Sequence, residues 1–148
     1  MQTTIFETIL NAPIQKVYEF HCDTNNLPLI TPPWIKVSIV KLDLPLVQGS
    51  HIILDITRFG FTQQWEMEIE AMRPNEAVID RAIRSPFKSF RHVHGFEKID
   101  KNQTRMKDIV EFALPLAPLS NIALAFVKSD FARMFHFRHE KTARALGE

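Results

Sequence analysis

The chain has 148 residues, 18 basic and 17 acidic side chains, and a formal net charge of +1 at pH 7. This length predicts one domain, residues 1–148, that buries roughly 70% of its unfolded surface. The balanced charge argues against a dedicated nucleic-acid-binding protein, which would carry a basic excess, and a hydrophobic fraction of 45% argues against disorder.

The N-terminal segment begins without the basic and apolar regions of a signal peptide, and Thr3–Leu10 alternates as a strand does. Asn11 and Pro13 then predict the start of a helix, with Asn11 as its N-cap. That helix should direct Val17, Tyr18 and Phe20 inward. Residues 23–33 contain three prolines and can form only short helices. The single cysteine, Cys22, excludes an intrachain disulfide and a thiolate metal cluster, and we expect it to be inert.

The middle of the chain is a series of short strands. Period-two alternation and turn residues predict strands over Ile35–Leu42, Ser50–Phe59, Phe61–Met72 and Ala77–Arg84. In the third of these, even-numbered polar residues from Thr62 to Glu70 form an outer face, and Trp65, Met67 and Ile69 form an inner face. A loop at 73–76 places Glu68 opposite Arg81 and Ile69 opposite Asp80.

Residues 87–113 predict a β-hairpin with its turn at Asp100-Lys101-Asn102, because Asn tolerates the left-handed backbone of such a turn. Two pairs of opposite charge then face each other, Arg91 with Glu111 and Glu97 with Arg105, which supports this register. Val93 and Ile109 lie opposite each other on the same face. The other face consists of the pairs Phe90–Phe112, His92–Val110, His94–Asp108 and Phe96–Met106.

That second face is too apolar for solvent and too polar for an ordinary core, and therefore suggests the wall of a cavity. A loop at 85–87 places Ala82 opposite Phe90 and Asp80 opposite His92. Two His–Asp pairs, His94–Asp108 and Asp80–His92, are therefore expected on the inner face. Burying several ionisable groups without a task is costly.

The last element is a helix from about Pro118 to Ala145, in which apolar residues recur every three or four positions. Asp130 lies on its inner stripe, and we expect it to reach the surface. No stretch approaches the ~20 apolar residues of a membrane span. The elements together predict an α+β fold with two layers, a seven-stranded antiparallel sheet against a long C-terminal helix, with one or two short helices after the first strand.

Several segments resemble the START/polyketide-cyclase (SRPBCC) superfamily, and in particular a bacterial ligand-binding branch of it. The segments are Asn11–Val17, Asn26–Trp34, Pro86-Phe87 through His92, His94 and Phe96, Thr104–Phe112 followed by Pro115, and Phe137-Arg138-His139. The resemblance covers nearly the whole chain. It implies a helix-grip fold, in which a sheet curves around the C-terminal helix with a cavity between them. The single glycine of the 44–49 loop departs from the glycine-rich loop of the plant members, so phosphate binding by that loop is not expected.

Candidate ligand-binding residues are the four polar side chains and the apolar lining of the inner face. They are Asp80, His92, His94, Asp108, Trp65, Met67, Phe90, Phe96, Met106, Phe112, Phe126 and Met134. His94 could act as a general base oriented by Asp108, although a buried pair that only satisfies itself is the simpler reading. Two histidines at i, i+2 could bind Zn²⁺, but their expected carboxylate partners argue against it, so no metal and no cofactor is predicted. We expect His21 to point away from Cys22, and Arg138 and His139 to have structural roles.

Three functions fit these residues. The first is a cytoplasmic protein that binds a hydrophobic small molecule with a polar end, such as a lipid, quinone or polyketide-like compound. The second is a cyclase, dehydratase or hydrolase acting on a similar ligand with His94 and Asp108 as its base pair. The third is a protein-interaction module that uses the outer face of the sheet, and the charges on that face argue against it.

Overall fold

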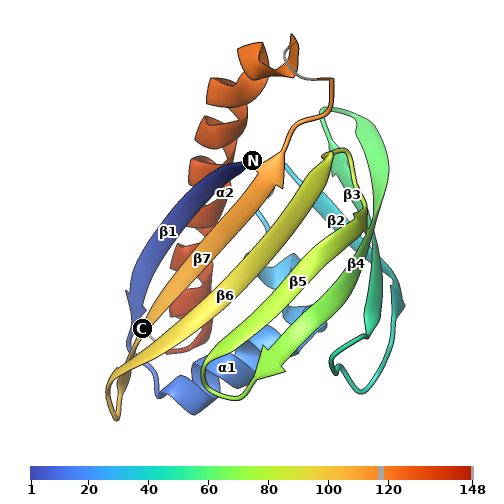
Figure 1. The fold of residues 1–148 in the computed structure, drawn as a ribbon. Coiled ribbons are helices and arrows are strands. Elements are labelled where there is room, and N and C mark those ends of the chain that lie inside the picture. Colours follow the sequence, from blue (N-terminus) through green and yellow to red (C-terminus); the bar gives the residue numbers. More distant parts are fainter. Residues whose placement is uncertain (117–118, 148) are drawn as a thin grey trace.

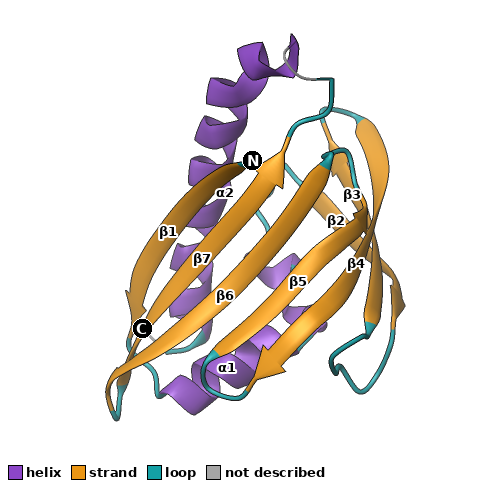
Figure 2. Ribbon diagram, in the orientation of Figure 1, coloured by secondary structure: helices purple, strands orange, loops and turns teal. Residues whose placement is uncertain are grey.

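The computed structural model describes residues 1–116 and 119–147, and in it one antiparallel sheet curves around the helices (Figures 1 and 2). The strands are β1 (Gln2–Leu10), β2 (Lys36–Leu42), β3 (His51–Arg58), β4 (Phe61–Arg73), β5 (Ala77–Arg84), β6 (Ser89–Asp100) and β7 (Gln103–Ala113). Their order in the sheet is β1-β7-β6-β5-β4-β3-β2. The predicted α+β fold with a seven-stranded sheet is confirmed.

The helices lie on the inner face of the curved sheet (Figure 2). They are α1 (Ile14–Cys22), the 3₁₀ turns η1 (Thr24–Asn26), η2 (Pro28–Ile30) and η3 (Leu119–Ala123), and the long α2 (Leu124–Ala145). Helix α2 packs against β1, and α1 packs against β5 and β6 (Figure 1). Pro118, the expected first residue of the last helix, lies outside the described residues. No described helix combines the length and apolar character needed to cross a membrane.

The start of α1 differs from the prediction. Pro13, in an extended conformation, precedes the first helical residue, and no side chain caps the helix. The Oδ1 atom of Asn11 instead accepts a hydrogen bond of 3.0 Å from Nε2 of Gln103. Asn11 therefore ties the end of β1 to the start of β7 and is not the N-cap that local sequence suggested.

The predicted register of the β6–β7 hairpin is confirmed over most of its length. Phe90 lies opposite Phe112, His94 opposite Asp108 and Phe96 opposite Met106, with a shift only next to the turn, between Lys98 and Asp100. The outer pairs also form, since Nη1 of Arg91 lies 3.1 Å from Oε1 of Glu111. This register places the histidines of β6 on the inner face, toward the helices.

The pairing of the neighbouring strands β4, β5 and β6 follows the prediction, except next to the turn between β4 and β5. Glu68 lies opposite Arg81, Ile69 opposite Asp80, and Asp80 opposite His92, as expected. Next to the 73–76 turn, however, the pairing shifts by one residue between Ile69 and Ala71. The loop is therefore one residue shorter than predicted, because Arg73 pairs with Ala77, and the irregularity in β4 restores the register beyond it.

Three apolar clusters hold the layers together. One contains Leu10, Val17, Val78, Phe96 and Met106 at the end covered by α1, and it also includes Leu146. A second joins β3 and β4, and a third packs Val110 and Phe112 against two phenylalanines of α2. Residues of the second and third clusters also line the cavity described below.

Candidate functional site

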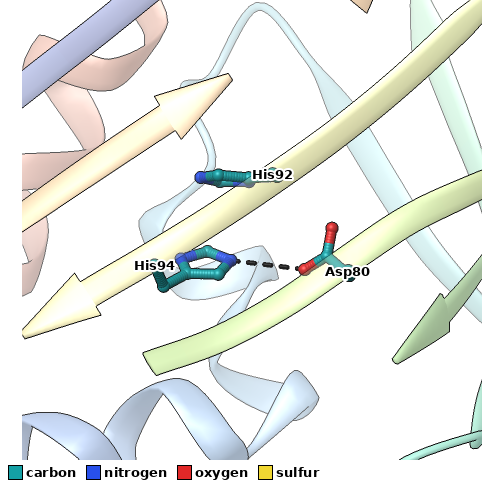
Figure 3. Close-up of side chains that lie close together, drawn as sticks. All are labelled: Asp80, His92 and His94. Atoms are coloured by element: carbon teal, nitrogen blue, oxygen red, sulfur yellow. Dashed lines mark hydrogen bonds and ion pairs between the residues drawn. The ribbon is translucent and has the colours of Figure 1, made fainter. Parts of the chain in front are cut away.

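Three adjacent strands bring the polar residues together. Asp80 lies on β5, His92 and His94 lie on β6, and Asp108 lies on β7, all on the inner face. The side chains at i and i+2 of one strand point to the same side, so the two imidazoles are neighbours. Their ring centroids are 3.8 Å apart and the rings are tilted by 35° (Figure 3).

The hydrogen bonds run diagonally and not directly across the strands. Nε2 of His92 donates to Oδ1 of Asp108 over 2.7 Å, and Nε2 of His94 donates to Oδ2 of Asp80 over 3.3 Å. The residues predicted to pair, His94 with Asp108 and Asp80 with His92, are opposite each other along the backbone, but each imidazole bonds the other carboxylate. Nδ1 of His94 is 3.2 Å from Oδ1 of Asp108, within ion-pair distance but outside hydrogen-bond geometry.

Helix α2 supplies a third histidine to the same carboxylate. Nε2 of His139 donates to Oδ2 of Asp108 over 2.6 Å, and both residues are buried. Asp108 is only 1% exposed and is shared by His92, His94 and His139. The structural role expected for His139 is therefore to fix the helix to the middle of the sheet through Asp108.

The charges in this cluster are set by burial and by these contacts. For Asp108, burial opposes the charge, but hydrogen bonds from His139 and His92 outweigh it and hold the pKa well below its ordinary value. Burial likewise opposes charge on His94, yet the carboxylates of Asp108 and Asp80 raise its pKa to about 9. For His92, burial and the neighbouring His94 lower the pKa. At neutral pH His94 is therefore the cation and His92 is neutral.

His21 on α1 also belongs to the site, where sequence analysis did not place it. Its ring centroid is 5.6 Å from that of His94, and its Nδ1 donates to the carbonyl of Val17 over 2.8 Å. Burial, and then the charge on His94, lower the pKa of His21 to about 4. The sequence did contain a signal for this position of His21. Residues four apart lie on the same face of a helix, and Val17 was already expected to face inward.

Arg138 on α2 was expected to be structural, but it also lines the cavity. Its guanidinium is buried, which lowers its pKa, although the charges of Asp108 and Asp80 act in the opposite direction. No carboxylate of the described residues lies within ion-pair distance of it, and its Nε has no hydrogen-bond partner among them. Its Nη2 donates to the sulfur of Met134 over 4.0 Å.

These residues form part of the wall of a cavity of about 320 Å³ between the sheet and helices α1 and α2. His21, Asp80, His92, His94 and Arg138 contribute polar groups to it. The rest of the wall is mostly apolar and comes largely from β2, β3, β4, the loop before β6, β6 itself and α2. It includes Val37, Ile52, Leu54, Ile56, Trp65, Met67, Ile69, Phe87, Phe90, Phe131 and Phe135.

The predicted lining divides into two groups. The residues that line the cavity are Asp80, His92, His94, Trp65, Met67, Phe90, Phe126 and Met134. The others lie behind it: Phe96 and Met106 pack against α1, Phe112 is covered by Phe131 and Phe87, and Asp108 is enclosed by its histidines. Local alternation showed which face these side chains occupy, but not which part of that face the helices cover.

Asp130 differs from its predicted place at the surface. Both of its carboxylate oxygens accept hydrogen bonds from the guanidinium of Arg58 on β3, and both residues line the cavity. Arg58 retains 26% and Asp130 only 11% of its side-chain exposure. The pair joins the N-terminal half of α2 to the sheet on the opposite wall.

The arrangement can provide apolar surface, a guanidinium, a neutral imidazole and a protonated imidazole within one cavity. Asp80, His92 and His94 are also the residues that could hold a metal ion, since their ligand atoms lie within 4.8 Å of one another. Tyr18 and Cys22 on α1 contribute no ionised group here, because burial raises the pKa of Tyr18 to about 12 and also raises that of Cys22.

Solved structures with the same fold come from several bacteria. A protein of Thermus thermophilus has 13% identity and a TM-score of 0.75, with 97% of this chain and 99% of that chain covered. A START superfamily protein of Mycobacterium smegmatis has 11% identity and a TM-score of 0.73, with 97% and 96% covered. The Zhui aromatase/cyclase of Streptomyces sp. R1128 has 15% identity and a TM-score of 0.70, with 98% and 90% covered.

No curated protein matches the sequence. The model of one family does match, and its description is polyketide cyclase / dehydrase and lipid transport. The match extends over residues 10–137 and so includes Asp80, both histidines of β6 and Asp108. Because it spans most of the 148 residues, this chain belongs to the polyketide cyclase / dehydrase and lipid transport family.

Proposed function

We propose that the protein binds a hydrophobic small molecule with a polar end, of the lipid, quinone or polyketide-like kind, in the cavity between the sheet and α2. The observation that supports this most is the composition of the wall, which is apolar over most of its area and carries at one part the guanidinium of Arg138, whose buried Nε has no hydrogen-bond partner among the described residues. A volume of about 320 Å³ lies within the range of small-molecule sites.

The apolar wall supplies affinity by removing ligand surface from water. Each Å² of apolar surface buried contributes about 25 cal/mol before the costs of association. Trp65 contacts both Phe87 and Phe90, with ring centroids 5.8 and 5.1 Å away, so aromatic side chains form a continuous part of this wall. Such a surface favours flat or flexible apolar groups, but it does little to fix the orientation of the ligand.

The orientation of the ligand in the cavity is set by the polar part of the wall. A buried N–H of a charged group without an acceptor is costly, and a ligand oxygen near Nε of Arg138 would reduce that cost. His94, which is protonated at neutral pH, lines the same cavity and adds a second positive charge to its wall. A carbonyl, hydroxyl or carboxylate at the end of an apolar body satisfies both requirements.

Binding can be measured through Trp65, since Trp34→Phe leaves it as the only tryptophan. We expect anilinonaphthalene sulfonate to bind with 1:1 stoichiometry and to quench Trp65. Val37→Phe, which fills the cavity from β2, should weaken this binding at least roughly tenfold. The matched control is Val40→Phe on the same strand, because Val40 is 52% exposed and does not line the cavity. Binding that is absent, or equal in the two variants, would contradict the proposal.

The polar end is tested with decanoate and decanol, two ligands that share a ten-carbon chain and differ in their head group, a charged carboxylate or a neutral hydroxyl. Arg138→Gln should weaken decanoate binding about tenfold or more, since a charge-assisted hydrogen bond contributes roughly 1.5–3 kcal/mol. Decanol binding should change much less. Arg133→Gln serves as the control, because Arg133 lies over the ring of exposed Trp34. Equal losses for both ligands would show that Arg138 only supports the fold.

Catalysis on a similar ligand is the second candidate, and the neutral imidazole beside the cavity favours it. The base in that case is His92 and not His94, because His94 already carries a proton at neutral pH. Asp108 would orient His92 through its 2.7 Å hydrogen bond. In a screen of polyketide-like substrates for cyclisation, dehydration or hydrolysis, His92→Gln should abolish any turnover by the wild type while Trp65 still reports binding.

A further inference from the structure

Asp80, His92 and His94 form a convergent set of ligand-type side chains in the cavity wall. Their ligand atoms lie within 4.8 Å of one another, and Figure 3 shows the Asp80 carboxylate next to the two imidazole rings. Two imidazoles and one carboxylate, with further positions left open, are a ligand set of zinc enzymes and of non-haem iron sites.

The nitrogens that face Asp80 are those that Asp108 leaves free. Strand β6 lies between β5 and β7, so Asp80 and Asp108 flank the two histidines on opposite sides. Asp108 bonds Nε2 of His92 and lies next to Nδ1 of His94. Nδ1 of His92 and Nε2 of His94 therefore remain for the side of Asp80.

The distances suit a small divalent ion after modest side-chain rotation. Nε2 of His94 is 3.3 Å from Oδ2 of Asp80. Two ligands at ~2.0 Å from a tetrahedral ion are separated by roughly 3.3 Å, so this pair already has the required spacing. In binding, the ion takes the place of the proton that His94 donates to Asp80, and that proton leaves to solvent.

Asp108 can act as the outer carboxylate that orients the two histidine ligands of such a site. Metal-binding histidines usually donate their second N–H to a carboxylate, which fixes the ring orientation and increases its basicity. Here one carboxylate faces the second nitrogen of both rings, and His139 holds that carboxylate over 2.6 Å.

We propose that Asp80, His92 and His94 bind a divalent transition-metal ion of the zinc class, with the remaining coordination positions open to the cavity. All three residues line that cavity, so the ion is reachable and a ligand oxygen could complete its coordination. The proposal concerns the ion alone and holds whether or not a small molecule occupies the cavity.

The test uses the full chain without a histidine tag, treated with chelator and dialysed. Calorimetric titration with Zn²⁺ should show one site per chain, and Co²⁺ should give the visible absorption of a four- or five-coordinate site. His92→Gln, His94→Gln and Asp80→Asn should each weaken Zn²⁺ binding at least ~100-fold. Asp108→Asn should weaken it about 10–100-fold, the effect typical of a supporting carboxylate.

The controls are the surface histidines that also lie near carboxylates. His51 lies 3.3 Å from Glu66 and 3.5 Å from Glu68, and His136 lies 3.1 Å from Glu140. His51→Gln and His136→Gln should leave Zn²⁺ binding unchanged. In the wild type, bound Co²⁺ should broaden the amide NMR signals around Asp80 and His92 most, which needs no variant to fold. The proposal is overturned if no 1:1 complex forms, or if the broadening and the loss of binding follow His51 or His136.

Discussion

Replacing Asp108 by Asn should lower the free energy of unfolding by about 3–5 kcal/mol, the cost of removing one partner from a buried ion pair. Asp108 is 1% exposed and takes hydrogen bonds from His92 and His139. An amide has one oxygen acceptor where the carboxylate has two, so one imidazole N–H loses its partner. The proton on His94 also loses one of its two compensating charges.

The measurement is urea unfolding at pH 7 in the presence of EDTA, followed by circular dichroism. Asp55→Asn is the matched control, because Asp55 has only a 3.4 Å contact with Gln64 and should change the free energy by less than about 0.5 kcal/mol. A loss below about 1 kcal/mol for Asp108→Asn would mean that the cluster does not depend on this carboxylate.

Stability of the metal-free protein should be greatest near pH 6.5 and fall on both sides. On the acid side, His21 is neutral in the folded protein, with its pKa lowered from 6.5 to about 4. The unfolded chain therefore binds more protons between these values, so this contribution is present above pH 6.5 and is lost as the pH falls toward 4. At about 1.4 kcal/mol per pH unit, the loss is on the order of 3 kcal/mol.

On the alkaline side the sign is reversed. The pKa of His94 rises from 6.5 to about 9 in the folded protein, so the folded state binds more protons between these values. Its stabilising contribution is present below pH 6.5 and is lost as the pH rises through 9. The loss is again on the order of 3 kcal/mol.

Urea unfolding midpoints measured from pH 4 to pH 9 would show the loss of stability on the acid side (the acid limb) and on the alkaline side (the alkaline limb). His21→Phe should flatten the acid limb while leaving the alkaline one, because Phe cannot be protonated and fits beside Phe20 and Phe96. The lowered pKa of His92 leaves part of the acid limb in place. His136→Phe is the control, since the side chain of His136 is 77% exposed. An acid limb that is unchanged in His21→Phe would show that His21 is not held neutral by burial.

Much of the sheet was predictable because charge pairs and alternation are local properties. Arg91 with Glu111 and Glu97 with Arg105 fixed the register of the last hairpin, and every inner pair followed from it. The seven strands and the long C-terminal helix followed from periodicity in the same way. The irregularity in β4 did not, because a one-residue shift near a turn leaves the alternation beyond it unchanged.

The site was predicted less completely because it depends on how the layers meet. His92, His94, Asp80 and Asp108 were assigned to one face, but their diagonal hydrogen bonds depend on where His139 of α2 holds the Asp108 carboxylate. His21 and Arg138 enter the cavity wall only through the docking of α1 and α2. No periodicity within one element reports how two elements are oriented to each other.

The ion pair between Arg58 and Asp130 links α2 to β3, on opposite walls of the cavity. If the two walls move apart, this bidentate ion pair must lengthen or break, and it is only partly shielded from water. Dissolved salt weakens such contacts far more than it weakens apolar packing. The residence time of an occupant should therefore shorten as ionic strength rises, even where its equilibrium affinity stays nearly constant.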